Sequence, residues 1–183
     1  MDIRLDGRTA LVTGASSGLG LRFATLLAEA GASVAVCARR KDRLDALVQA
    51  IAAKGGRAHA VAMDVTDVAS IRAGFAAAEA ALGPLDVVVN NSGVAVTRRA
   101  VDVEEADYDE VMDTNLRGAF FVAQAAGRAM IASQRRGRII NIASAGGLRP
   151  LSQISVYCIS KAAVIHMTRA LAQEWGRHGI NVN

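Results

Sequence analysis

The sequence predicts an α/β fold in which helices cover both faces of a doubly wound parallel sheet. Three observations support this fold class. Strand-like and helix-like segments alternate along the chain, the strand-like segments are continuously apolar, and a glycine-rich turn joins the first strand to the first helix. Continuously apolar strands are typical of parallel sheets that are buried on both sides.

The predicted elements follow from hydrophobic periodicity and from the residues that end helices. Helical segments carry apolar residues at helical spacing, and glycines follow the first three of them. The predicted strands are 8–13, 33–38, 58–63, 85–89, 138–143 and 180–183. The predicted helices are 18–30, 40–54, 67–82, about 104–133, and 152–175.

Particular side chains define faces and caps in these helices. Thr66 precedes the third helix and is its expected N-cap. The expected apolar face of the first helix is Leu19, Phe23, Leu26, Leu27 and Ala30, and that of the second is Leu44, Leu47, Val48 and Ile51. Two longer loops, 93–103 and 144–152, follow the fourth and fifth strands. Since ligands bind at the carboxyl ends of strands in such sheets, these loops are the first candidates for a site.

Length and composition favour one domain over residues 1–183. The chain is 52% hydrophobic and 21% charged, which excludes intrinsic disorder, and a second full domain would be cramped at this length. The net charge of +4 comes from scattered residues, and aromatic residues make up only 4%. The two dense basic clusters are Arg39 to Lys41 and Arg135 to Arg138, and the second is better explained as a solvated turn than as a nucleic-acid surface.

Membrane association and secretion are not indicated. No apolar run reaches the roughly 18 residues that span a bilayer, and the N-terminus lacks the apolar segment of a signal peptide. Cys37 and Cys158 lie in apolar segments without metal-ligand spacing. We therefore expect a cytoplasmic protein with two buried, unpaired thiols and no metal site.

The glycine-rich turn predicts a dinucleotide site of the Rossmann type. Gly14, Gly18 and Gly20 follow the first strand with the spacing G-x-x-x-G-x-G. Gly14 permits a tight turn, Gly18 lets the backbone approach a phosphate, and Gly20 lets the helix pack closely on the strand. The N-terminus of the helix then offers free N–H groups and partial positive charge to a pyrophosphate.

The end of the second strand favours NADP(H) over NAD(H). An NAD site usually places a carboxylate there for the ribose 2′-hydroxyl, whereas an arginine suits the 2′-phosphate of NADP. Here Ala38 is followed by Arg39 and Arg40, and no carboxylate is present. The alternative is that both arginines are solvated residues that open the second helix.

A tyrosine–lysine pair predicts acid–base chemistry. Tyr157 and Lys161 are four residues apart in a predicted helix and so project from the same face. A nearby ammonium favours phenolate, and such a tyrosine can donate a proton to a carbonyl oxygen or accept one from an alcohol. Ser144 follows the fifth strand, where its hydroxyl could reach a substrate oxygen, although it could equally be a loop-starting serine.

Together these motifs resemble the short-chain dehydrogenase/reductase family in its compact one-domain subtype. The resemblance covers the whole chain and includes the cofactor motif from Thr13 to Gly20, with Asn90-Asn91-Ser92-Gly93 after the fourth strand. It implies the sheet order 3-2-1-4-5-6, with the last family strand absent. The family continues for several tens of residues through a substrate lid, so the resemblance also implies that the fold is truncated after residue 183.

The resemblance assigns roles residue by residue. The implied catalytic residues are Asn115, Ser144, Tyr157 and Lys161. The implied cofactor-binding residues are Gly14, Ser16, Ser17, Gly18, Leu19, Gly20, Arg39, Asp64, Val65, Asn91, Ser92, Gly93, Tyr157 and Lys161. Tyr157 would act as general acid or base, Lys161 would lower its pKa and hold the nicotinamide ribose, Ser144 would position the substrate carbonyl, and Asn115 would support a proton relay.

The sequence therefore predicts an NADP(H)-dependent oxidoreductase acting on a carbonyl or secondary alcohol. The alternative is a non-catalytic dinucleotide-binding or regulatory module, which would not need the four catalytic residues. Val94, Val96, Leu148, Leu151 and Ile154 indicate a fairly apolar substrate wall.

A homodimer or homotetramer is expected. The resemblance implies assembly through the long helix and the Tyr157 helix. Alanine-rich stripes recur on both, at Ala119, Ala123, Ala126 and Met130, and at Ala162, Ile165, Arg169 and Ala172. If Ala126 faces the partner, Ala126→Arg should break the dimer and leave the fold intact.

Overall fold

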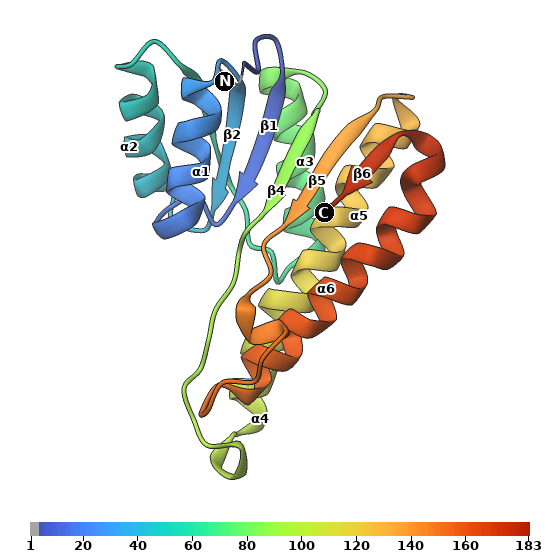
Figure 1. Ribbon diagram of the computed structural model, residues 1–183. Helices are drawn as coiled ribbons and strands as arrows, with labels where there is room; N and C mark the ends of the chain where they lie inside the picture. The colour runs from blue at the N-terminus through green and yellow to red at the C-terminus, as the bar shows by residue number, and fades with distance from the viewer. Residues whose placement is uncertain (1–3) are drawn as a thin grey trace.

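The computed structural model describes residues 4–183 and confirms the predicted sheet order β3-β2-β1-β4-β5-β6, with all strands parallel (Figure 1). The strands are β1 (Thr9–Thr13), β2 (Ser33–Ala38), β3 (Arg57–Ala62), β4 (Val87–Asn90), β5 (Gly137–Asn141) and β6 (Ile180–Val182). The helices are α1 (Gly18–Glu29), α2 (Lys41–Ala52), α3 (Val68–Leu82), α4 (Glu105–Met112), α5 (Ala119–Ala132) and α6 (Ser155–Trp175).

Two cores lie on opposite faces of the sheet. Successive strand residues point to opposite sides, so Val12 packs with α1 and α2 while its neighbour Leu11 packs with α3, α5 and α6. Leu44, Leu47 and Ile51 of α2 are buried as predicted. This layering leaves the carboxyl ends of the strands free at one edge of the sheet (Figure 1).

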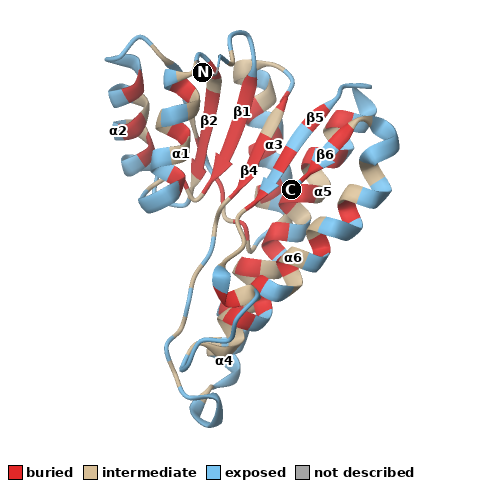
Figure 2. Cartoon of the chain, in the orientation of Figure 1, coloured by how far each residue is buried: buried red, intermediate tan, exposed pale blue. Residues whose placement is uncertain are grey.

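One face of the sheet is open at β5 and β6, contrary to the expectation that helices cover both sides throughout. Arg138 and Ile140 of β5 are exposed, and in Figure 2 no described helix lies over them. The reason is that α5 and α6, which precede and follow β5, both pack on the other face.

The predicted apolar face of α1 is correct only in part. Phe23 and Leu27 pack against the core, whereas Leu19 and Leu26 are 62% and 44% exposed. The buried residues of this helix are Gly20, Ala24 and Ala28, small residues at four-residue spacing that let α1 approach the strands closely.

The predicted N-cap of α3 is also wrong. The cap is Asp67, whose carboxylate accepts a hydrogen bond from Ala69 N at 2.9 Å. A carboxylate also interacts favourably with the positive end of the helix dipole. Thr66 instead donates its hydroxyl hydrogen to Asp64 Oδ1 at 2.8 Å.

The predicted long helix is interrupted. A wider π-helical segment, Asp113–Gly118, separates α4 from α5 and contains Asn115. Such segments are rare and often occur at functional sites. Both cysteines are free and buried, as expected, and burial raises the pKa of the Cys37 thiol. Among residues 4–183, no helix is long and apolar enough to cross a membrane.

Asp86 anchors the amino-terminal edge of the sheet. Its carboxylate is 5% exposed and accepts hydrogen bonds from Thr9 N at 3.0 Å, from Arg135 at 2.8 Å and from Arg8 at 3.3 Å. Desolvation raises the pKa of Asp86, but the bonds from Arg135 and Thr9 and the charges of both arginines outweigh it, so this pKa lies below its usual value. The ionised carboxylate therefore stabilises the folded state.

We expect Asp86→Asn to destabilise the protein at neutral pH by about 1.5–3 kcal/mol, the range for hydrogen bonds to a charged group. Because the folded pKa is depressed, the contribution of ionised Asp86 is present above the unfolded pKa of about 3.9 and is lost as pH falls through the folded value. Urea unfolding across the acid range measures it. Asp45→Asn is the control, since Asp45 pairs with Lys41 on the surface. An equal loss in both variants would contradict this role for Asp86.

Candidate active site

The glycine-rich turn has the geometry that its sequence predicts. Gly14 and Gly18 have φ values of +66° and +56°, a region that favours glycine. A Cβ at Gly20 would overlap the carbonyl oxygen of Gly14, so only glycine lets α1 start this close to β1. Asn91, from the end of β4, donates from Nδ2 to Thr13 O at 3.0 Å and holds the turn against the neighbouring strand.

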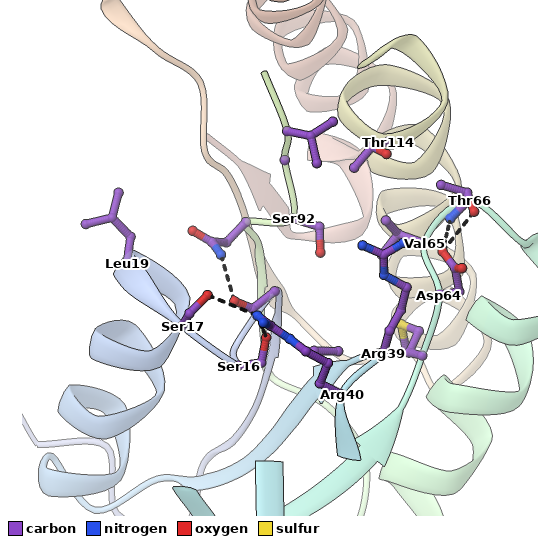
Figure 3. Close-up of a pocket in the computed structure, with 16 residues that line it drawn as sticks. Ser16, Ser17, Leu19, Arg39, Arg40, Asp64, Val65, Thr66, Ser92 and Thr114 are labelled. Atoms are coloured by element: carbon purple, nitrogen blue, oxygen red, sulfur yellow. Dashed lines mark hydrogen bonds between the residues drawn. The ribbon is translucent and has the colours of Figure 1, made fainter. Parts of the chain in front are cut away.

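A cavity of about 640 Å³ opens at this turn, on the carboxyl edge of the sheet (Figure 3). Its volume is in the usual range for ligand pockets. The lining residues are Gly14, Ser16, Ser17, Leu19, Ala38, Arg39, Arg40, Met63, Asp64, Val65, Thr66, Asn91, Ser92, Gly93, Val94 and Thr114. Exposed Leu19, which the first-helix prediction placed with the apolar face, contributes to this cavity.

Two arginines enter the cavity in different directions. Arg40 donates from Nη2 to Ser16 Oγ at 3.0 Å and to Ser17 Oγ at 3.4 Å, so its guanidinium lies on the glycine-rich turn. Arg39 extends towards the side formed by Asp64 and Val65 (Figure 3). Arg40 is a lining residue that the sequence reasoning did not assign to the cofactor, although its position beside Arg39 was a usable signal.

Asp64 forms the opposite wall. Its Oδ1 accepts hydrogen bonds from Thr66 N at 3.0 Å and from Thr66 Oγ1 at 2.8 Å. Burial raises the pKa of Asp64, but the two bonds from Thr66 and the nearby charge of Arg39 lower it by more, so the pKa lies below its ordinary value. The cavity thus offers the Asp64 carboxylate at one side and the Arg40 guanidinium, which lies on the glycine-rich turn, at another.

Lys161 and Asn115 meet beside Gly93, at the inner end of the cavity. A Cβ at Gly93 would lie 3.3 Å from Asn115 Oδ1 and 3.4 Å from Lys161 Nζ, so the glycine leaves room for both. Lys161 Nζ donates to Ile142 O at 2.8 Å and lies 5.8 Å from the centre of the Tyr157 ring. Burial lowers the pKa of Lys161 below its usual value.

Ser144 and Tyr157 both lie beside Gly146. A Cβ at Gly146 would lie 3.4 Å from Ser144 Oγ and 3.5 Å from Tyr157 Cε1. Ser144 Oγ accepts a hydrogen bond from Gly146 N at 3.0 Å, which leaves its own hydrogen available to a substrate oxygen. The four predicted catalytic residues, which come from three segments of the chain, therefore gather around the loops at the carboxyl ends of β4 and β5.

The predicted cofactor residues divide into three groups. Most line the cavity, whereas Gly18 and Gly20 shape the turn, and Tyr157 and Lys161 lie beyond Gly93. The lining residues that the sequence reasoning missed are Ala38, Arg40, Met63, Thr66, Val94 and Thr114. Thr114 directly precedes Asn115, a predicted catalytic residue, and this position is the one local signal that Thr114 could belong to the site.

The two long loops lie side by side, as their shared edge of the sheet predicts. Arg98 N donates to Gln153 O at 2.7 Å, and Arg98 forms a parallel bridge with Ile154. Leu148 and Leu151 are 74% and 51% exposed, so these two members of the predicted apolar substrate wall do not enclose a pocket.

Comparison with known proteins relates this geometry to a family. The family model described as short chain dehydrogenase matches residues 8–183. Sorbitol dehydrogenase of Cereibacter sphaeroides is 41% identical over 181 residues, which are 99% of this chain and 70% of the relative. The NAD-dependent glycerol dehydrogenase of Listeria innocua is 37% identical over 182 residues, 100% of this chain and 70% of the relative.

A solved structure is similar over the same range. The gluconate 5-dehydrogenase of Burkholderia cenocepacia, in complex with NADP and tartrate, superposes with a TM-score of 0.94 at 37% identity. The match covers 100% of this chain and 71% of that one.

Proposed function

The chain belongs to the short-chain dehydrogenase family, and from this premise we propose that it transfers a hydride between NADP(H) and a carbonyl or secondary-alcohol substrate. The observation that carries the proposal is that Ser144 and Tyr157 both lie beside Gly146, with Lys161 5.8 Å from the centre of the Tyr157 ring and Asn115 next to Lys161 at Gly93. A binding module would need the cavity but not this group of four side chains.

Each of the four residues has a chemical role in this proposal. Tyr157 donates its phenolic proton to the carbonyl oxygen during reduction and accepts one from the alcohol during oxidation. Lys161, held by Ile142 O, places its amino group 5.8 Å from the centre of the Tyr157 ring, close to the residue that exchanges the proton. Ser144 donates to the substrate oxygen and stabilises the negative charge that develops there. Asn115 supports the proton relay that passes through Lys161 and returns a proton to Tyr157. The bound nicotinamide would supply or accept the hydride.

The residues of the cavity fit NADP(H). The pyrophosphate would meet the free N–H groups at the start of α1, and Arg40 and Arg39 would bind the 2′-phosphate. Asp64 and Val65 would border the adenine. Because relatives named for NAD and for NADP both match this chain, the preference rests on its own residues: two arginines and no carboxylate follow Ala38.

The substrate class that we propose is a polyol or sugar acid with a secondary alcohol. The names of the relatives support it, since they act on sorbitol, glycerol and gluconate. The test is NADPH oxidation with a panel of keto-sugars, keto-acids and apolar ketones. Turnover only with apolar ketones would contradict this class, and cofactor binding without turnover on any of them would favour the binding-module alternative.

We further propose that residues 1–183, of which the first three lie outside the described part, act as one dinucleotide-binding and catalytic domain. The glycine-rich turn and the four catalytic residues share one edge of a single sheet, which supports this. Two buried, unpaired cysteines support a reducing, cytoplasmic setting.

One of the two predicted stripes is buried within the subunit. Ala119, Ala123, Ala126 and Met130 belong to the core, so Ala126→Arg would disrupt the core rather than test a dimer. On the second stripe, Ala162 and Arg169 are exposed. An apolar groove of about 640 Å³ lies between the outer faces of α5 and α6, with Phe120 38% exposed at its edge. We propose that a second copy packs here.

Phe120→Arg should therefore shift the protein from dimer to monomer without unfolding it. The substitution places a charge in an interface that must be largely apolar. Light scattering across micromolar concentrations measures the mass. Leu26→Arg on α1 is the matched control. Leu26 is a large apolar residue with an exposure similar to that of Phe120, and α1 lies far from α5 and α6 (Figure 1). A wild-type monomer at every concentration would contradict the interface.

A further inference from the structure

Ser160 connects two parts of the proposed active site and has no role in the function derived so far. It lies between Tyr157 and Lys161 on α6 and is completely buried. Its hydroxyl donates to Tyr157 O at 2.7 Å and accepts from Asn115 Nδ2 at 3.0 Å. Because its single hydrogen is used within α6, Ser160 can only accept from Asn115.

The amide of Asn115 is otherwise bound to one residue. Its Oδ1 accepts from Val94 N at 2.8 Å, and its Nδ2 donates to Val94 O at 2.8 Å. These two bonds fix the amide to the loop after β4, which also carries Gly93. Among the described residues, the bond to Ser160 is the only side-chain hydrogen bond that connects this loop and Asn115 to α6.

We propose that Ser160 is a positioning residue, whose hydroxyl holds Asn115 and the Gly93–Val94 loop at a fixed place relative to Tyr157 and Lys161. This inference rests on the proposed function of those residues. Asn115 Oδ1 and Lys161 Nζ both lie within 3.4 Å of the position that a Cβ on Gly93 would take, so a shift of the loop would change the surroundings of both groups directly. Ser160 is fully buried and does not line the cavity. It therefore cannot contact a ligand there and acts through Asn115.

The first measurement does not depend on turnover. In the wild-type chain, the side-chain amide hydrogens of Asn115 are expected to exchange slowly with solvent, since the residue is 1% exposed and both hydrogens are bonded. Ser160→Ala removes one acceptor and should accelerate this exchange in the NMR spectrum of the folded protein. Ser160→Thr keeps the hydroxyl and should preserve slow exchange. Unchanged exchange in Ser160→Ala would overturn the proposal.

The second measurement is kinetic. Ser160→Ala should lower kcat about tenfold, because small misplacements of catalytic groups have effects of this size or larger. In an Asn115→Ala background, Ser160→Ala should lower kcat no further. Independent, multiplying losses in this double-mutant cycle would show that Ser160 does not act through Asn115.

Two controls separate the possible failures. Tyr157→Phe in the same assay tests the proposed function itself: if it stays active, that function fails, whereas an inactive Tyr157→Phe with a fully active Ser160→Ala overturns only the present inference. A merely structural role would lower the unfolding temperature of Ser160→Ala but leave kcat of the folded protein unchanged. If the added methyl of Ser160→Thr prevents folding, the exchange experiment and the double-mutant cycle with Ser160→Ala decide the question.

Discussion

Replacing Tyr157 by Phe is expected to lower turnover by at least about 100-fold, the low end for general acid–base catalysis. The substitution keeps the ring beside Gly146 and Lys161 and removes only the group that exchanges a proton with the substrate oxygen. The Kd for NADPH should stay near that of the wild type, because the cavity residues are unchanged. Steady-state kinetics and fluorescence titration with NADPH measure the two effects separately.

The chain provides a matched control in its only other tyrosine. Tyr108 lies on α4 and is 45% exposed. It does not line the cavity and is not among the residues next to Gly146. Tyr108→Phe should therefore retain full turnover. Near-native turnover of Tyr157→Phe would remove the proposed mechanism, whereas equal losses in both variants would indicate a general effect of the substitution.

Replacing Arg39 by Asp is expected to weaken NADP(H) binding by about tenfold to more than a hundredfold and to favour NAD(H). The loss of a charge-assisted hydrogen bond to the 2′-phosphate costs about 1.5–3 kcal/mol, which corresponds to that change in affinity. The new carboxylate would accept from the ribose 2′-hydroxyl of NAD and repel the phosphate of NADP. Binding isotherms with both cofactors measure the ratio.

Two further variants locate the effect. Arg40→Asp should also weaken NADP binding, because Arg40 lines the same cavity and donates hydrogen bonds to Ser16 and Ser17 on the glycine-rich turn. Arg43→Asp makes the same change of charge on α2 without lining this cavity and should leave the ratio unchanged. Equal affinity of the wild-type protein for the two cofactors would contradict the assignment of the arginines.

The sequence was sufficient for features that depend on short-range pattern. The positive φ values of Gly14 and Gly18 were predictable, since glycine has a distinctive conformational range. The sheet order was expected from the family resemblance. The gathering of Tyr157 and Lys161 on one face of α6 follows from helical periodicity alone. Their approach to Ser144 and Asn115 was expected only from the family resemblance.

Features that depend on the distance between elements were not predictable in this way. The larger apolar residues of α1 define its predicted face, but the close approach of this helix to the sheet buries Gly20, Ala24 and Ala28 most completely. For the same reason the alanines of α5 are buried within the subunit, although their spacing is equally compatible with a dimer interface. The link from Ser160 to Asn115 joins residues 45 positions apart and leaves no local signal.

The most direct test of the account is whether the full chain transfers a hydride. NADPH carrying deuterium at C4 of the nicotinamide would be incubated with the protein and with keto-sugars and keto-acids, and the products would be analysed by mass spectrometry and NMR. The account predicts deuterium on the carbinol carbon of the product, with one NADP formed for each alcohol, and no transfer by Tyr157→Phe above background. Saturable binding of NADPH with no deuterium in any product would contradict it and identify the chain as a dinucleotide-binding module.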